Sequence, residues 1–223
     1  MPRLVAVGML ASGEGTTMEA LAEQAAGGHV PARISLVLSD RPSAPVLEKA
    51  RRRGLATAVL PVRGVPPEKW STDATRVLSD AGVELVVLAG FLAILPSPFV
   101  RTWEGRAINL HPSLLPRYGG RGFYGDKVHA AVLAAGDSET GASINLVTDE
   151  VDGGPVIAQQ KVLVEPGDTP ESLRHRVQAA ERVALYSVIT RFAEGEWPLP
   201  YRGPSDRSGS RGPGRDPLSG ASR

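Results

Sequence analysis

Short apolar runs alternate with stretches of helical periodicity through the first half of the chain. Runs typical of strands buried on both faces occupy residues 4–10, 33–39, 57–62 and 84–89. Between them the apolar residues take helical spacing, which predicts helices through Met18, Leu21 and Ala25, over 46–53 and over 67–81. This alternation predicts a doubly wound α/β fold.

The second half continues the pattern with longer elements. We expect a short strand at 107–111, a helix over 127–135, strands at 142–147 and 156–164, and a final helix from Thr169 to about Phe192. Pro170 supports this helix start, because proline is favoured in the first turn. Glu181 falls four residues after Val177, on the apolar side of the helix. A carboxylate there needs either a buried donor or a cationic ligand, and the sequence leaves both open.

Two polar side chains lie together at the end of the strand at 107–111. Side chains alternate along a strand, so Asn109 and His111 share one face while Ile108 and Leu110 take the other. An amide and an imidazole in this position can stabilise a developing negative charge and move a proton. A strand-end histidine beside a turn-closing asparagine fits these residues equally well.

A glycine-rich loop at residues 11–17 follows the first strand and precedes a helix. Gly13 and Gly15 permit close approach to the backbone, and Thr16 and Thr17 add hydroxyls at the helix start, a combination suited to phosphate. Glu14 stands where a P-loop requires lysine, and Met18 stands where a dinucleotide fingerprint requires its third glycine. A monophosphate is therefore favoured over a nucleotide, with a tight turn that binds nothing as the alternative.

Three further loops carry candidate groups. The apolar loop at 90–96 follows a central strand, where it could hold a flat aromatic cofactor or pack against the core. Asp40 follows the second strand, and capping of the turn before Pro42 is favoured over a ribose contact. Asp152 precedes two glycines and a proline, which can aim its side chain from a tight bend. Asp149 and Glu150 fit solvated loop charges.

Composition limits the classes of protein. The chain has 223 residues and no cysteine, so it fits one domain of a cytoplasmic protein without disulfides. We expect a folded domain over 1–197 and a disordered tail over 198–223, rich in Arg, Gly, Pro and Ser. The tail carries a net charge of +3 and the remainder −2, which argues against nucleic-acid binding by the domain. No run is apolar enough for a membrane span, and no histidine pattern predicts a metal site.

Four motifs together resemble one family. They are the glycine-rich loop, Val86-Val-Leu-Ala-Gly-Phe91, the block from Asn109 to Pro116 (Asn-Leu-His-Pro-Ser-Leu-Leu-Pro), and Val151-Asp-Gly-Gly-Pro155. In this order they closely resemble the phosphoribosylglycinamide formyltransferase family of folate-dependent enzymes in purine synthesis, from about residue 4 to residue 196. The resemblance implies a Rossmann-like, mostly parallel twisted sheet with helices on both faces. It also implies two small-molecule substrates, 10-formyltetrahydrofolate and glycinamide ribonucleotide, with monomer and homodimer both open.

The resemblance also implies roles for individual residues. The catalytic group maps onto Asn109, His111 and Asp152. The substrate phosphate maps onto Gly13, Gly15, Thr16 and Thr17, and the rest of the glycinamide substrate onto Gln178 and Glu181. The folate site maps onto Phe91, Leu92, Ala93, Ile94 and Leu95, with Thr148 and Asp149 beside it. The family often has Asn, Arg and His where this chain has Thr17, Ala93 and Asn145, and the segment 119–125 also differs.

The implied reaction agrees with the chemistry of these side chains. His111 and Asn109 can stabilise the oxyanion formed when an amine attacks the formyl carbon, and Asp152 can orient His111 and assist proton transfer. Two other functions compete: formyltetrahydrofolate hydrolysis, in which water replaces the amine, and a non-catalytic domain that binds a phosphate ligand. The glycine-rich loop argues against the hydrolase, which has no phosphorylated acceptor, and the polar group at 109, 111 and 152 argues against a binding domain.

Overall fold

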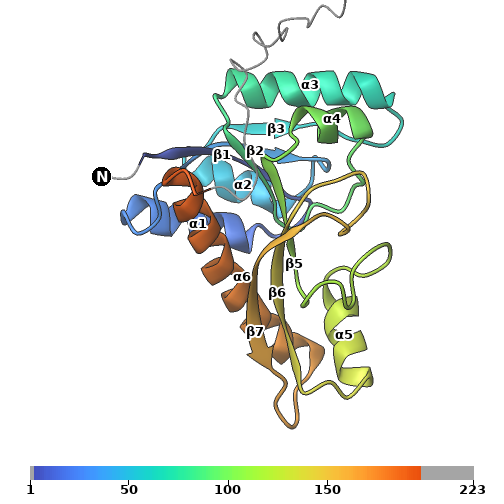
Figure 1. Cartoon of the computed structure of the whole chain (residues 1–223). Coiled ribbons are helices and arrows are strands. Elements are labelled where there is room, and N and C mark those ends of the chain that lie inside the picture. Colours follow the sequence, from blue (N-terminus) through green and yellow to red (C-terminus); the bar gives the residue numbers. More distant parts are fainter. Residues whose placement is uncertain (1–2, 197–223) are drawn as a thin grey trace, which may run out of the picture.

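The computed structural model describes residues 3–196, which form a seven-stranded sheet with helices on both faces (Figure 1). The strands lie in the order β3-β2-β1-β4-β5-β6-β7. Five are parallel: β1 (Val5–Leu10), β2 (Ala32–Ser39), β3 (Thr57–Val59), β4 (Leu85–Leu88) and β5 (Ala107–His111). The last two are antiparallel to their neighbours: β6 (Glu139–Leu146) and β7 (Val156–Leu163). The predicted α/β class and mostly parallel sheet are confirmed.

The helices divide between the two faces of the sheet, as predicted. One face is covered by α1 (Thr16–Ala26), α2 (Pro45–Arg52) and the C-terminal half of α6 (Pro170–Ala193). The other is covered by α3 (Pro67–Asp80) and α4 (Ser97–Thr102), which pack together (Figure 1). The helix α5 (Asp126–Ala134) packs against α6 beside β6.

The central strands are buried because helices cover both of their faces. Every residue of β1 and β4 is buried, which explains why both read as continuous apolar runs. On β5, Ile108 and Leu110 face the core under α6, whereas Asn109 and His111 face the opposite side. The predicted alternation along this strand is confirmed.

Three elements differ from the sequence prediction by more than one or two residues. The strand β3 ends at Val59 rather than Val62, because Pro61 has no N–H with which to continue the ladder. The strand β6 begins at Glu139 instead of residue 142, since β7 supplies a partner for residues that carry little apolar signal. The helix α4 was not predicted; it has six residues, and Pro96 and Pro98 at its start hide the periodicity.

The order of the strands places the loops of interest at one edge of the sheet. The chain crosses from β2 and β3 back past β1 to β4, so β1 and β4 flank the switch point at which ligands bind in open α/β sheets. The loops after β1 and β4 are joined there by a hydrogen bond from Ser12 N–H to Gly90 O (3.1 Å). The fold therefore brings the glycine-rich loop beside the apolar loop at 90–96.

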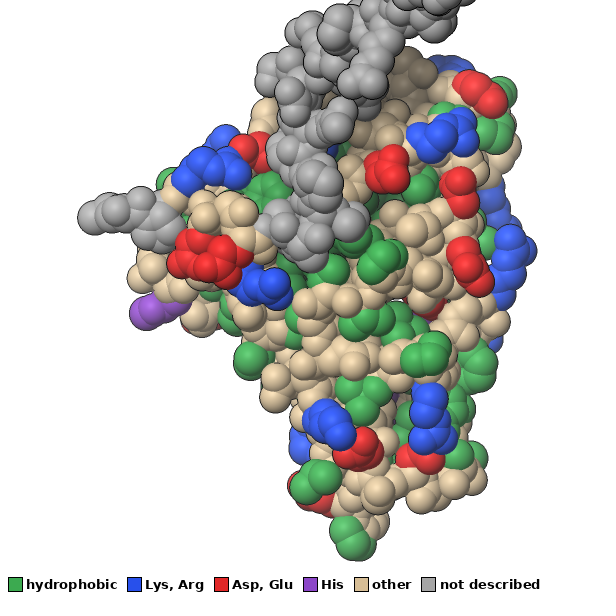
Figure 2. Space-filling model, viewed as in Figure 1, with side chains coloured by type: hydrophobic (Ala, Val, Ile, Leu, Met, Phe, Trp, Pro, Cys, Tyr) green, Lys and Arg blue, Asp and Glu red, His purple; other side chains and the backbone are tan. Residues whose placement is uncertain are grey.

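Acidic and basic side chains are interspersed over the face shown in Figure 2. Within residues 3–196, no helix is both long and apolar enough to cross a membrane. The tail predicted at 198–223 lies outside the described residues.

Candidate active site

A cavity of about 540 Å³ opens at the carboxyl end of the parallel strands. It is lined by the loops after β1, β4, β5 and β6, and by one face of α6. Every site residue predicted from the sequence lines this one cavity: Gly13, Gly15, Thr16, Thr17, Phe91, Leu92, Ala93, Ile94, Leu95, Asn109, His111, Thr148, Asp149, Asp152, Gln178 and Glu181. Segments far apart in the sequence therefore meet at one site.

Asn109, His111 and Asp152 form a connected polar group at the centre of the cavity. Asn109 Nδ2 donates to Asp152 Oδ1 (3.0 Å) and more weakly to Asn145 Oδ1 (3.3 Å). His111 Nδ1 lies 3.4 Å from Asp152 Oδ2. The side chains of His111 and Asp152 are only 4% and 10% exposed, so water screens their interaction weakly.

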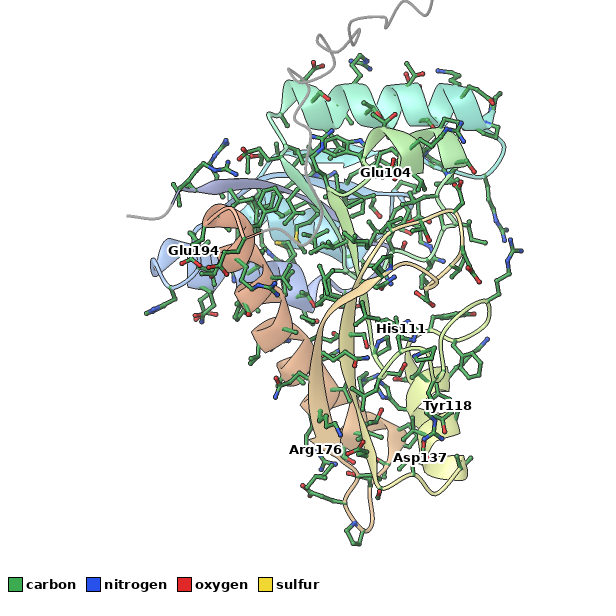
Figure 3. All side chains as sticks on the ribbon, in the orientation of Figure 1. Glu104, His111, Tyr118, Asp137, Arg176 and Glu194 are labelled. Carbon is green, nitrogen blue, oxygen red and sulfur yellow. The ribbon has the colours of Figure 1, made fainter. Side chains whose placement is uncertain are left out.

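The segment after β5 holds the imidazole and the carboxylate from the other side. His111 Nε2 lies 2.7 Å from the carbonyl oxygen of Tyr118, and a carbonyl can only accept, so Nε2 carries a proton. Figure 3 labels both residues on the side of the sheet where α5 lies. Gly120 N–H donates to Asp152 Oδ2 (2.9 Å). A second proton, on Nδ1, would complete an ion pair between His111 and Asp152. The loop at 118–120 is thus tied to both groups that could move a proton.

Asp152 occupies an unusual backbone conformation. Its φ is +56°, in the left-handed region that non-glycine residues seldom adopt. The following glycines are needed for space, since a Cβ on Gly154 would lie 1.9 Å from Leu146 O and one on Gly153 would lie 2.5 Å from Glu150 Cγ. The sequence predicts backbone freedom at the two glycines, but the residue in the unusual conformation is Asp152 itself. Strain of this kind is common at functional sites.

The glycine-rich loop presents backbone N–H groups to the cavity. The first intrahelical hydrogen bond of α1 runs from Glu19 N–H to Gly15 O (3.0 Å), so the N–H groups before Glu19 have no partner within the helix. Gly15 has φ +73°, and a Cβ there would lie 2.4 Å from Val46 Cγ2. Gly13 is different, because a Cβ there would meet no atom within 4 Å. Gly15 is therefore required by the fold, whereas Gly13 leaves open space.

The loop at 91–95 forms an apolar wall of the cavity. Leu92 and Ile94 are 45% and 52% exposed, which is high for large aliphatic side chains beside a cavity. Phe91 and Leu95 are partly buried and pack against the core under α3 and α4. The packing alternative is therefore confirmed for Phe91 and Leu95, while Leu92 and Ile94 leave apolar surface beside the cavity.

The structure shows no hydrogen-bond donor at Glu181 in the described residues, so the buried-donor alternative is wrong. It is 8% exposed and lines the cavity, and no donor in residues 3–196 hydrogen-bonds its carboxyl group. Burial raises its pKa to about 7, and the positive charge of Arg182 opposes this rise. The carboxyl group is thus free to meet a ligand. Gln178 lines the cavity one turn earlier on the same helix, α6.

The cavity is also lined by residues that the sequence did not predict as site residues. They include Asn145, which pairs with Asn109 across β5 and β6, and the cations Arg121 and Arg174. Arg174 makes two hydrogen bonds of 3.0 Å to Asp126, at the start of α5. His129 also lines the cavity and burial lowers its pKa. Only Asn145 had a usable signal, because Ser143 and Asn145 alternate with apolar residues along β6.

One expected role is corrected by the structure. Asp40 does not cap the turn before Pro42; its Oδ1 accepts a hydrogen bond from Ser12 Oγ (2.5 Å). The reason is that β1 and β2 are adjacent and end together, which brings the two side chains within reach.

Residues 3–196 hold no cluster of three or more His, Asp or Glu side chains arranged to bind a metal ion.

Comparison with known proteins agrees with this geometry. The formyl transferase family model matches residues 5–189. The phosphoribosylglycinamide formyltransferase of Escherichia coli (strain K12) is 37% identical over 188 residues, covering 84% of this chain and 86% of that protein. The crystal structure of glycinamide ribonucleotide transformylase 1 from Symbiobacterium toebii superposes with a TM-score of 0.78 at 35% identity, covering 86% of this chain and 89% of that one.

A larger relative shares the same region. The trifunctional purine biosynthetic protein adenosine-3 of Gallus gallus is 40% identical over 192 residues, which is 86% of this chain. The chain spans only 19% of the length of that relative. The family model covers most of the chain, and the Escherichia coli relative matches along most of its own length. The chain therefore belongs to the formyl transferase family.

Proposed function

We propose that this protein transfers the formyl group of 10-formyltetrahydrofolate to the amine of glycinamide ribonucleotide, a step of purine biosynthesis. The observation that carries the proposal is the single cavity that joins the glycine-rich loop, the apolar wall at 91–95 and the group of Asn109, His111 and Asp152. The relatives named for this activity support it. The lack of cysteine is consistent with a cytoplasmic location.

The glycinamide substrate would extend from the glycine-rich loop toward α6. Its phosphate would be held by the N–H groups at the start of α1 and by the hydroxyls of Thr16 and Thr17. Gln178 and Glu181 would bind the remainder, since both lie on the cavity side of α6. An ionised Glu181 suits a positively charged amine, and a protonated one can donate a hydrogen bond.

The folate would lie against the apolar wall. A cavity of about 540 Å³ falls in the range of small-molecule sites, and Leu92 and Ile94 offer exposed apolar surface to a flat ring. Thr148 and Asp149 line the same cavity from the loop after β6. Ala93 brings no positive charge, so recognition of the carboxylates of the folate would come from elsewhere in the chain.

The central polar group would carry the chemistry. Asn109 and a protonated His111 would stabilise the oxyanion as the new bond forms between the amine nitrogen and the formyl carbon. Asp152 would hold His111 and help a proton move from that nitrogen to N10 of the folate, whose bond to the formyl carbon breaks. The nucleophile belongs to the substrate, so no covalent enzyme intermediate is required.

The hydrogen bonds of Asn109 indicate which partner the formyl oxygen would replace when it binds to the amide. Both amide hydrogens of Asn109 are engaged, one by Asp152 at 3.0 Å and one by Asn145 at 3.3 Å. The longer bond is the weaker, so a formyl oxygen would displace Asn145 and leave Asp152 in place. Asp152 would then keep both Asn109 and His111 aimed during the reaction.

One assay tests the proposal against its alternatives. Purified protein is mixed with 10-formyltetrahydrofolate, with and without glycinamide ribonucleotide, and the release of tetrahydrofolate is followed. Release that requires glycinamide ribonucleotide supports the transferase. Release at the same rate without it would indicate a formyltetrahydrofolate hydrolase. Binding of phosphate compounds without any release would indicate a non-catalytic domain.

A further inference from the structure

Ser12 makes hydrogen bonds that join three strand ends. Its hydroxyl donates to Asp40 Oδ1 (2.5 Å) after β2 and accepts from Leu92 N–H (2.8 Å) in the loop after β4. Its own N–H donates to Gly90 O (3.1 Å). Ser12 is 3% exposed, and the Asp40 side chain is 12% exposed. The Ser12 hydroxyl and the Asp40 carboxylate are therefore largely shielded from water, although Gly90 and Leu92 are exposed.

The charge of Asp40 fixes the direction of these bonds. An ionised carboxylate can only accept, so the single hydroxyl hydrogen of Ser12 is committed to Asp40 and its lone pairs remain for Leu92 N–H. A donor that is already polarised by an anion is also a better acceptor, so each bond strengthens the other. Arg41 Nε lies 3.9 Å from the other carboxylate oxygen of Asp40, and the Arg41 side chain is half exposed. Its attraction to Asp40 is therefore weaker than the hydrogen bond from Ser12.

This arrangement sets the shape of the apolar wall. Gly90 turns the chain after β4 with φ +68°, and two residues later Leu92 N–H is fixed to Ser12 while its side chain stays 45% exposed beside the cavity. Ser12 also directly precedes Gly13, the first residue of the glycine-rich loop to line the cavity. One buried hydroxyl thus holds the wall at 91–95 in register with that loop.

We infer that Ser12, held by Asp40, is a positioning residue that keeps the apolar wall at 91–95 in the shape that binds folate. The inference rests on the proposed function for the assignment of folate to this wall. Neither residue lines the cavity, so each acts through Leu92 and not by touching a substrate. Loss of the hydroxyl is expected to weaken folate binding while leaving the phosphate site and the chemical step nearly intact.

The kinetic test compares Ser12→Ala with Ser43→Ala, which removes an exposed hydroxyl from the loop after β2. Ser12→Ala should raise the KM for 10-formyltetrahydrofolate roughly tenfold, the effect of one lost hydrogen bond, and change kcat and the KM for glycinamide ribonucleotide less than about twofold. Asp40→Asn should give a smaller rise, because it keeps an acceptor but removes the charge. Equal changes in both KM values would overturn the inference.

Two measurements without turnover complete the test. Hydrogen exchange should be faster at the Leu92 amide in Ser12→Ala than in the wild type, with exchange in β1 and β4 unchanged. The Kd for tetrahydrofolate should rise about tenfold and the Kd for inorganic phosphate should stay constant. Unchanged exchange at Leu92, or unchanged tetrahydrofolate binding, would overturn the inference.

These measurements also separate this inference from the proposed function. If the wild type bound tetrahydrofolate but transferred no formyl group, the proposed reaction would fail, whereas a selective loss of tetrahydrofolate binding in Ser12→Ala would still support the positioning role. If transfer proceeded normally in Ser12→Ala with both KM values unchanged, the reaction would stand and the positioning role would be wrong. If Ser12→Ala did not fold, Asp40→Asn would carry the same comparisons.

Discussion

His111 Nδ1 lies 3.4 Å from Asp152 Oδ2, although His111 ends β5 and Asp152 lies in the loop between β6 and β7. The contact is possible because the chain at Asp152 takes a left-handed turn that points its carboxylate back over β5. The same carboxylate also accepts from Asn109 and from Gly120 N–H. One side chain therefore fixes the amide, the imidazole and the loop after β5.

Replacing either partner should abolish most of the activity without unfolding the protein. We expect His111→Ala and Asp152→Asn each to lower kcat by at least ~100-fold, the scale for loss of a positioned acid or base. Asparagine tolerates the left-handed conformation, so Asp152→Asn should keep the backbone. Kinetics measured beside circular dichroism test this expectation. The exposed residues His175 and Asp80 provide controls, and near-normal turnover in a variant would remove that residue from the mechanism.

Gly13 and Gly15 offer a matched pair for the phosphate site. Gly13→Ala should leave the melting temperature nearly unchanged, since its Cβ meets no protein atom, and should raise the KM for glycinamide ribonucleotide roughly tenfold by crowding the phosphate. Gly15→Ala should instead lower the melting temperature, because of its φ of +73° and its contact with Val46. A normal KM in Gly13→Ala would place the phosphate elsewhere.

Glu181 should make the stability of the protein depend on pH. The pKa of Glu181 is about 7 in the folded protein, against an ordinary value of 4.5 that applies to the unfolded chain. The folded chain therefore holds this proton more strongly than the unfolded chain. The contribution of protonated Glu181 to the free energy of unfolding is fully present below pH 4.5 and is lost as pH rises through 7. This contribution is about 3 kcal/mol at most. Glu181→Gln, which mimics the protonated form, should therefore melt above the wild type at pH 8, with the gain shrinking toward pH 5.

Calorimetry at both pH values measures this difference, with Glu171→Gln as the control because Glu171 is exposed on the same helix. A gain of equal size at pH 5 and pH 8 would mean that ionisation of Glu181 is not its source. A loss of stability at pH 8 would mean that the ionised carboxylate has a partner in the folded protein.

Deleting residues 201–223 should leave formyl transfer unchanged. The cavity is built from residues 13–181, and the family model ends at residue 189, so the proposed catalytic domain is complete before the deleted segment. Comparison of kcat, both KM values and the melting temperature with the full chain checks this. A change in KM alone would show that the deleted segment contributes to substrate binding.

The sequence by itself determined the elements and most of the candidate residues. Buried parallel strands must be apolar throughout, so β1, β2 and β4 were visible in the pattern. Alternation along β5 placed Asn109 and His111 on one face, and local turn chemistry marked the glycine-rich loop. Each of these features depends on residues near one another in the chain. The end of β3 and the short helix α4 were misjudged because prolines altered the local signal.

Only the tertiary structure decided which groups touch. The partners of Asp152 and the bridge from Ser12 to Asp40 and Leu92 come from strands that are distant in sequence, and no local pattern encodes which strand ends meet. The conformation of Asp152 and the pKa of Glu181 depend likewise on surrounding elements. Burial, strain and contact distance are properties of the packed chain, whereas periodicity reports only which residues are able to be buried.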